Sequence, residues 1–120
     1  MRDANFSVKN KIAAIHHSKF IDVKAIAHSK TPIGYMFFLD ENIARKSTFK
    51  NIDYDFSILH IKSSKDIEYT PGAMAFILSS LASEWINVSH VIGCREDTFL
   101  VVKEYDAPIA FIILAQRLKI

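Results

Sequence analysis

Histidine and cysteine are the residue types in this chain with the widest chemical range. Three of the five histidines, His28, His60 and His90, fall on expected strands, where their imidazoles could converge as zinc ligands. Their spacing follows no metal-binding motif, so surface or core histidines are the simpler interpretation. The sole cysteine, Cys94, lies beside Arg95, whose charge could favour a reactive thiolate. No partner base is evident, so we expect no metal site and no catalytic residue.

Other motifs for catalysis or nucleotide binding are missing from the sequence. The serines at 79 and 80 lack a Gly-x-Ser-x-Gly context, and there is no phosphate-binding glycine loop. Lysines in the first half, together with Tyr35 and Phe37, could suit an RNA-binding sheet. The RNP1 pattern is absent and the net charge is only +2, so we expect no nucleic-acid partner. An enzyme that uses Cys94 or the histidines is retained only as a third hypothesis.

The length and composition indicate a single globular domain, or two very small ones that share a core. The chain has 120 residues, of which half are hydrophobic and only 6 are glycine or proline, which excludes disorder and fibrous repeats. One cysteine excludes an internal disulfide framework and suits the reducing cytoplasm, which is the expected location. The longest apolar stretch, residues 107–115, is too short to span a bilayer, and residues 1–5 lack signal-peptide character, so no membrane partner is expected.

The first half predicts two helices and two strands. The apolar residues Val8, Ile12 and Ile15 recur at i, i+4 and i+7, the spacing of a helix face. Apolar and charged residues alternate from position 21 to 25, which is typical of a strand. The expected elements are a helix from Ser7 through Ile15, a strand over 21–27, a turn over 29–34, a strand over 35–39 and a short helix capped by Asp40.

The second half gives a clearer pattern. The expected elements are a strand over 56–62, a loop over 63–71, a helix from Gly72, a strand over 86–92, a turn over 93–97, a strand over 98–103 and a helix over 109–118 capped by Asp106. One face of the first helix carries Met74, Ile77, Leu78, Leu81 and Trp85. The β-branched residues of the last helix leave a strand as the alternative there.

The two halves show a similar order of elements. The paired segments are 21–23 with 86–88, 35–38 with 99–102, and the helix-leading aspartates Asp40 and Asp106. This suggests an internal repeat, with residues 1–53 as an N-terminal αββα half and residues 54–120 as the second domain. Few residues are identical, so two unrelated αββα pieces remain the alternative.

The turn that opens the second-half helix is the best candidate for ligand binding. Gly72 allows the backbone to approach a ligand closely, and Pro71 fixes the direction of the chain before it. The helix that follows presents free N–H groups and a positive dipole end, which suit a carboxylate. At the next strand, Asn87 can both donate and accept hydrogen bonds, which suits an amino acid. An ordinary strand–helix turn is the alternative.

Residues 55–115 resemble an ACT domain, the small-molecule-sensing module of amino-acid metabolism. The matching segments are Thr70-Pro71-Gly72-Ala73-Met74, Leu81-Ala82, Ile86-Asn87-Val88, the strand from Thr98, and Ala107 and Ala110. Trp85 stands where the family usually has a glycine. Within the family, the resemblance is closest to the ACT domains of aspartate kinases, in which two such modules interlock. The resemblance implies an α+β, ferredoxin-like βαββα(β) ACT fold, either alone or as two interlocked ACT-like halves of which the first is degenerate.

The resemblance also implies a ligand and its site. The ligand would be a small amino acid or related metabolite, held between this loop and the strand of a neighbouring module, without a cofactor. The ligand-binding residues implied are Asp66, Thr70, Gly72, Ala73, Met74, Asn87 and Val88.

An unpaired sheet edge leads to an expected homodimer. No closing strand follows the last helix, so residues 21–39 or a partner must cover the exposed edge. Trp85, Phe99 and Phe111 could contribute to such an interface or to the core. We therefore expect a non-catalytic regulatory module that signals to an unidentified partner enzyme or regulator. A ligand-free ACT-like module for dimerisation or protein interaction is the alternative.

Overall fold

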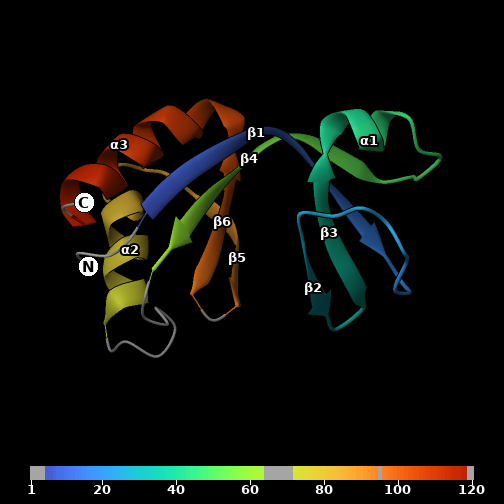
Figure 1. The fold of residues 1–120 in the computed structure, drawn as a ribbon, viewed down its shortest axis with the longest axis horizontal. Coiled ribbons are helices and arrows are strands. Elements are labelled where there is room, and N and C mark those ends of the chain that lie inside the picture. Colours follow the sequence, from blue (N-terminus) through green and yellow to red (C-terminus); the bar gives the residue numbers. More distant parts are fainter. Residues whose placement is uncertain (1–4, 64–71, 95, 119–120) are drawn as a thin grey trace.

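The computed structural model describes residues 5–63, 72–94 and 96–118 and has an α+β, ferredoxin-like fold (Figure 1). Its elements are β1 (Asn5–His17), β2 (Ala27–Thr31), β3 (Gly34–Asp40), α1 (Glu41–Arg45), β4 (Ile52–Lys62), α2 (Ala73–Ala82), β5 (Val88–Cys94), β6 (Asp97–Lys103), a 3₁₀ turn (Glu104–Asp106) and α3 (Ala107–Leu118). The strands pair in the order β2-β3-β1-β4-β6-β5, and every pairing is antiparallel.

A long ribbon of β1 and β4 joins two lobes (Figure 1). Beyond the C-terminal part of β4 the sheet continues through β6 and β5, and beyond the C-terminal part of β1 it continues through β3 and β2. Each lobe therefore takes one strand from the other half of the chain. The expectation that residues 21–39 or a partner close the second-half sheet is wrong, because residues 5–9 of β1 pair with β4 at that edge.

Matching bulges in β1 and β4 relate the two halves. Lys11 has a φ of 58° and Asp55 a φ of 66°. Each directly precedes four buried residues, which are 12–15 in β1 and 56–59 in β4. An extra residue in a strand changes the face that the following side chains take, so each strand can serve both lobes. The bulges thus occupy corresponding positions in the element series β1-β2-β3-α1 and β4-α2-β5-β6-α3, of which the first contains no helix after its first strand.

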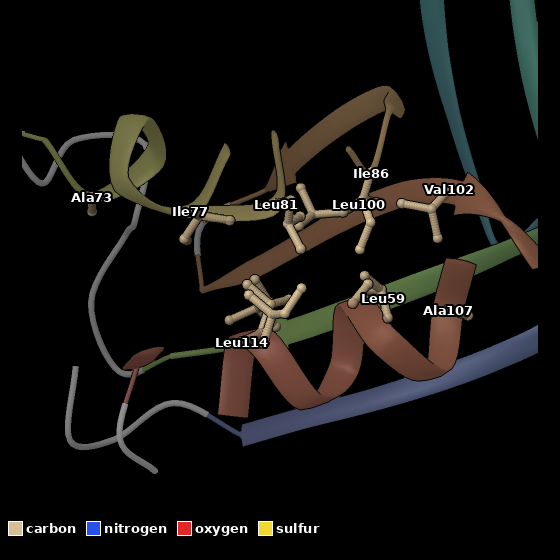
Figure 2. Close-up of a cluster of buried hydrophobic side chains, with 12 residues drawn as sticks. Leu59, Ala73, Ile77, Leu81, Ile86, Leu100, Val102, Ala107 and Leu114 are labelled. Carbon is tan, nitrogen blue, oxygen red and sulfur yellow. The ribbon is translucent and has the colours of Figure 1, made fainter. Parts of the chain in front are cut away.

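The largest apolar cluster lies between α2, α3 and the second-half sheet (Figure 2). Its buried members are Leu59, Ile61, Ala73, Ile77, Leu81, Ile86, Leu100, Val102, Ala107, Ala110, Ile113 and Leu114. Each fully buried leucine or isoleucine stabilises the fold by roughly 1.5–3 kcal/mol. This cluster therefore fixes α2, and with it the predicted ligand-binding turn, on the sheet.

Two further clusters hold the first half in place. One joins the lobes across the opposite face of the sheet, and its buried members are Ile12, Ala14, Phe38, Phe56, Ile58 and Val101. Phe38 of β3 and His90 of β5 meet across this seam with their ring centroids 5.0 Å apart. The other cluster lies beside α1, and its buried members are Ala13, Ile15, Phe37, Leu39 and Ala44.

The predicted helix from Ser7 through Ile15 is wrong, because this segment forms β1. Val8, Ile12 and Ile15 belong to three different apolar clusters rather than to one helix face. Their helical spacing arises because β1 is buried on both faces and contains a bulge.

The predicted strand over residues 21–27 is also wrong for most of its length. Residues 21–25 form a loop, in which the N–H of Val23 donates to the carbonyl of Ile21 and the N–H of Ala25 to that of Val23. Ile21, Val23 and Ala25 do pack together against the cluster beside α1. The alternation therefore identified the side chains that point inward, although the backbone turns locally instead of pairing with a strand.

The predicted Asp40 cap and the predicted last helix are confirmed. The Asp40 carboxylate accepts a hydrogen bond from the N–H of Asn42, at 2.8 Å, at the start of α1. Residues 107–118 form α3 rather than the alternative strand, and Pro108 lies in its first turn. Trp85 was predicted to lie on the apolar face of α2, but it lies outside this helix, which ends at Ala82.

Candidate functional site

Gly72 begins α2 in a left-handed conformation. Its φ is 76°, and an added Cβ would meet no described atom within 4 Å. No described side chain caps the helix here, and the first helical hydrogen bond runs from the N–H of Phe76 to the carbonyl of Gly72, at 2.9 Å. The N–H groups of residues 73–75 are therefore not used within the helix. They form a positive helix end, which suits a carboxylate.

The next two predicted residues, Ala73 and Met74, anchor this helix end on the apolar core. Ala73 is 8% exposed and belongs to the largest apolar cluster, and Met74 packs against the same cluster. Their side chains therefore fix the backbone of the turn, whose main-chain groups are the candidate ligand contacts. Asp66 and Thr70, the two other predicted loop residues, lie outside the described residues.

Asn87 and Val88 lie at the other end of α2. The N–H of Ile86 donates to the carbonyl of Leu81, at 3.1 Å, which ties this segment to the C-terminal end of the helix. The ten residues of α2 span about 15 Å. Asn87 is exposed, whereas Val88 packs against the largest cluster. The structure therefore does not bring the two groups of predicted residues together within one chain, and one ligand could touch both only if a second copy supplied one of them.

Trp85 follows the C-terminal end of α2, two residues before Asn87, and its side chain is 94% exposed. Its φ is 60°, a conformation that glycine adopts without strain. This explains why the family to which the sequence is similar usually has glycine at this position. Phe99 is partly buried against the seam between the lobes, and Phe111 is 36% exposed. Of the three predicted interface residues, Trp85 is thus the one most fully available to a partner.

An open apolar groove beside α3 is a feature that sequence reasoning missed. It has a volume of about 540 Å³ and is lined by Phe6, Ser7, Val8, Asn10, Ala107, Pro108 and Phe111. The rings of Phe6 and Phe111 meet edge to face, with their centroids 6.4 Å apart. The groove could be found only by knowing that residues 5–11 form a strand next to α3, and the sequence pattern indicated a helix there.

The histidines do not form a metal site among the described residues, where no group of three possible ligands lies close together. His60 shares a hydrogen bond of 2.7 Å with Asp97 through Nε2 and stacks on Phe99, with the ring centroids 4.6 Å apart. His90 faces Phe38, and its Nδ1 is buried without a partner among the described residues. Burial lowers the pKa of His90 below its ordinary value. These contacts give His60 and His90 packing roles in the sheet.

Comparison with known proteins identifies the fold. No protein-family model matches the sequence, and no curated protein matches it. Solved structures do match: the regulatory subunit of aspartate kinase from Thermus flavus has a TM-score of 0.74 at 9% identity, with 97% of each chain covered. A Vibrio cholerae protein of unknown function, described as a possible transport protein, has a TM-score of 0.76 at 15% identity, covering 97% of this chain and 91% of that one.

A complete aspartate kinase is also similar over part of its length. The enzyme from Clostridium acetobutylicum has a TM-score of 0.72 at 12% identity, and the match covers 93% of this chain but 34% of the enzyme. The chain therefore spans about a third of that enzyme. These likenesses establish the ferredoxin-like fold of aspartate kinase regulatory domains, as the ACT resemblance implied. None of the described helices is long and apolar enough to cross a membrane.

Proposed function

We propose that this chain is a non-catalytic regulatory module that binds a small amino acid or related metabolite. The observation that carries the proposal is the N-terminal end of α2, which no described side chain caps and where Gly72 is left-handed, with no described atom within 4 Å of an added Cβ. A ligand carboxylate would accept hydrogen bonds from the free N–H groups of this helix end. The likeness to regulatory subunits of aspartate kinases supports the assignment, because it supplies a fold used for regulation.

In this proposal a second copy of the chain completes the site. Within one chain, Asn87 lies about one helix length from Gly72, so its amide would contact the ligand from the partner subunit. Trp85, next to Asn87 and 94% exposed, would be buried at the same dimer interface. Ligand binding would then favour one arrangement of the two subunits, and a partner enzyme or regulator would respond to that arrangement.

A thermal-shift screen of the twenty amino acids tests the proposal. A ligand at about 100 times its dissociation constant adds roughly 2.7 kcal/mol of stability, which raises Tm by several degrees. The variant Gly72→Trp should lose this shift, because the indole would fill the open space beside the helix end. The matched control is Gly72→Asn, because asparagine tolerates a positive φ and is much smaller. It should keep most of the shift.

A ligand-free interaction module is the second candidate, and the exposed apolar side chains favour it. Trp85, Ile109 and Ile112 are all more than half exposed, as expected of a chain that meets another protein. A flat screen with all twenty amino acids, together with a stable dimer, would replace the sensor function with this one.

A further inference from the structure

The N-terminal half of β1 has an open edge. β1 pairs with β4 from Asn5 to Ile15, but it pairs with β3 only from Ile12 to His17. In the part of the chain that the structure describes, residues 5–11 therefore bond to a neighbouring strand on one side alone (Figure 1). The backbone N–H and C=O groups on the other side can accept a further strand.

The face of this edge that points toward α3 is mainly apolar, with the polar Asn10 at its end. Phe6 and Val8 pack against the largest apolar cluster and line the groove described above. On the other wall of the groove, α3 contributes Pro108 and Phe111. Because side chains alternate along a strand, every second side chain of an added segment would enter this groove. The groove therefore selects apolar residues at alternate positions of the segment.

The other face of the edge is polar and positively charged. Ser7 and Lys9 on this face are exposed, as is Lys11 at the bulge that ends this stretch, and Lys9 lies opposite the apolar Ile58 on β4. Neither lysine forms an ion pair with another described residue. Opposite charges on neighbouring strands stabilise their pairing, and like charges weaken it. Pairing with a second copy through this edge would gather the lysines of both copies on one ribbon, so the charge favours an acidic partner.

We propose that the outer edge of residues 5–11 docks an extended segment of a partner protein in which apolar residues alternate with aspartate or glutamate. The segment adds a strand to the sheet, its apolar side chains fill the groove between β1 and α3, and its carboxylates lie beside Lys9 and Lys11. This docking needs no small-molecule ligand, so it goes beyond the proposed function and can fail or succeed independently of it.

A charge-swap experiment tests the docking surface. The probe is a short fluorescein-labelled peptide of alternating valine and aspartate, with a valine–lysine peptide as its counterpart, and binding is followed by fluorescence anisotropy. The unmodified chain should bind the aspartate peptide and not the lysine peptide, and added salt should weaken binding. The double variant Lys9→Glu/Lys11→Glu should reverse this preference, with a loss of about tenfold or more for the aspartate peptide.

A matched variant separates a local from a general charge effect. Lys24 and Lys50 are exposed and lie away from this edge, and Lys24→Glu/Lys50→Glu changes the net charge equally. This variant should keep its affinity for the aspartate peptide. The backbone amide signals of residues 5–11 should shift on peptide addition, as expected for a new strand.

Three results would overturn the proposal. The first is no binding of the aspartate peptide at millimolar concentration. The second is binding that both double variants weaken equally, which would indicate a general charge effect. The third is a dimer that the peptide dissociates through the amides of residues 5–11, which would assign this edge to a second copy of the chain.

Discussion

Trp85 has a left-handed backbone conformation that is unfavourable for a residue with a large side chain. The backbone φ is 60°, and the side chain is 94% exposed. The left-handed conformation costs a residue with a Cβ roughly 1–2 kcal/mol. In the proposed dimer, burial of this side chain at the interface would offset that cost. The sequence identified this position as a departure from a family glycine, but only the backbone angle shows what the departure costs.

Two substitutions separate the strain of Trp85 from its contact. Trp85→Gly should stabilise the monomer by about 1 kcal/mol and raise Tm by roughly 3–6 °C, because glycine relieves the strain. Trp85→Ala should give no such gain, because alanine keeps the unfavourable φ. Both variants should lower self-association, which analytical ultracentrifugation measures alongside Tm. Self-association that neither variant changes would exclude Trp85 from the dimer interface.

At the scale of elements, the β2–β3 hairpin fixes the end of β1. Gly34 has a φ of 147°, and a Cβ there would lie 2.3 Å from the carbonyl oxygen of His17 and 2.8 Å from the Cα of Ser18. The hairpin therefore packs directly on the backbone that leaves β1. Because both atoms belong to the backbone, they cannot move aside as a flexible side chain would.

Gly34→Ala should destabilise the fold by about 2 kcal/mol or more, because it combines a backbone clash with an unfavourable φ. The control is Gly72→Ala, where φ is 76° and no described atom lies within 4 Å of the new Cβ. That variant should lose only about 1 kcal/mol. Urea unfolding of both variants measures the difference. Equal losses would show that the close approach of Gly34 to β1 adds nothing.

The elements show what local sequence patterns can predict. The strands β3 and β6, the capped helix α1, and the helices α2 and α3 follow from local patterns. The two strands are short apolar runs buried on both faces, α1 begins with a recognisable cap, and α2 and α3 each bury one face. The N-terminal segment does not, because β1 lies at the centre of the molecule and its burial depends on β4, some forty residues later. The loop over residues 21–25 shows a strand pattern but has no strand beside it.

At the scale of the molecule, the two lobes meet at a seam that contains a histidine. His90 on β5 contacts Phe38 on β3, and its buried Nδ1 has no partner among the described residues. The other titratable side chains associated with these inner faces are His60, paired with Asp97, and His16, which lies 3.4 Å from the hydroxyl of Thr31. Protonation of His90 would place a charge in an otherwise apolar seam.

The free energy of unfolding should therefore depend on pH through His90. Burial lowers the pKa of His90 in the folded state, whereas the unfolded chain has the ordinary value of about 6.5. Its contribution is complete above about pH 6.5 and is lost as the pH falls through the lowered pKa of the folded state. His90→Phe should reduce this loss in urea unfolding, and His28→Phe, at an exposed position on β2, should not. Identical pH profiles for all three proteins would contradict this role.

The candidate site could be predicted only in part. The turn at Gly72 was recognisable as the start of a helix, because proline and glycine before an amphipathic segment mark such a boundary. Its separation from Asn87 was not, because that distance depends on the direction of α2 relative to β5. The groove beside α3 depends on a strand that the sequence pattern had assigned as a helix.

The central claim is that the N-terminal end of α2 binds an amino acid. The most direct measurement is an NMR titration of the ¹⁵N-labelled chain with the amino acid that gives the largest thermal shift. The account predicts saturable shifts in the amide signals of residues 72–75, with smaller shifts at Asn87 and Val88 that vanish when dimerisation is prevented. Amide signals of residues 72–75 that stay unchanged while others shift, or that stay unchanged with all twenty amino acids, would contradict it.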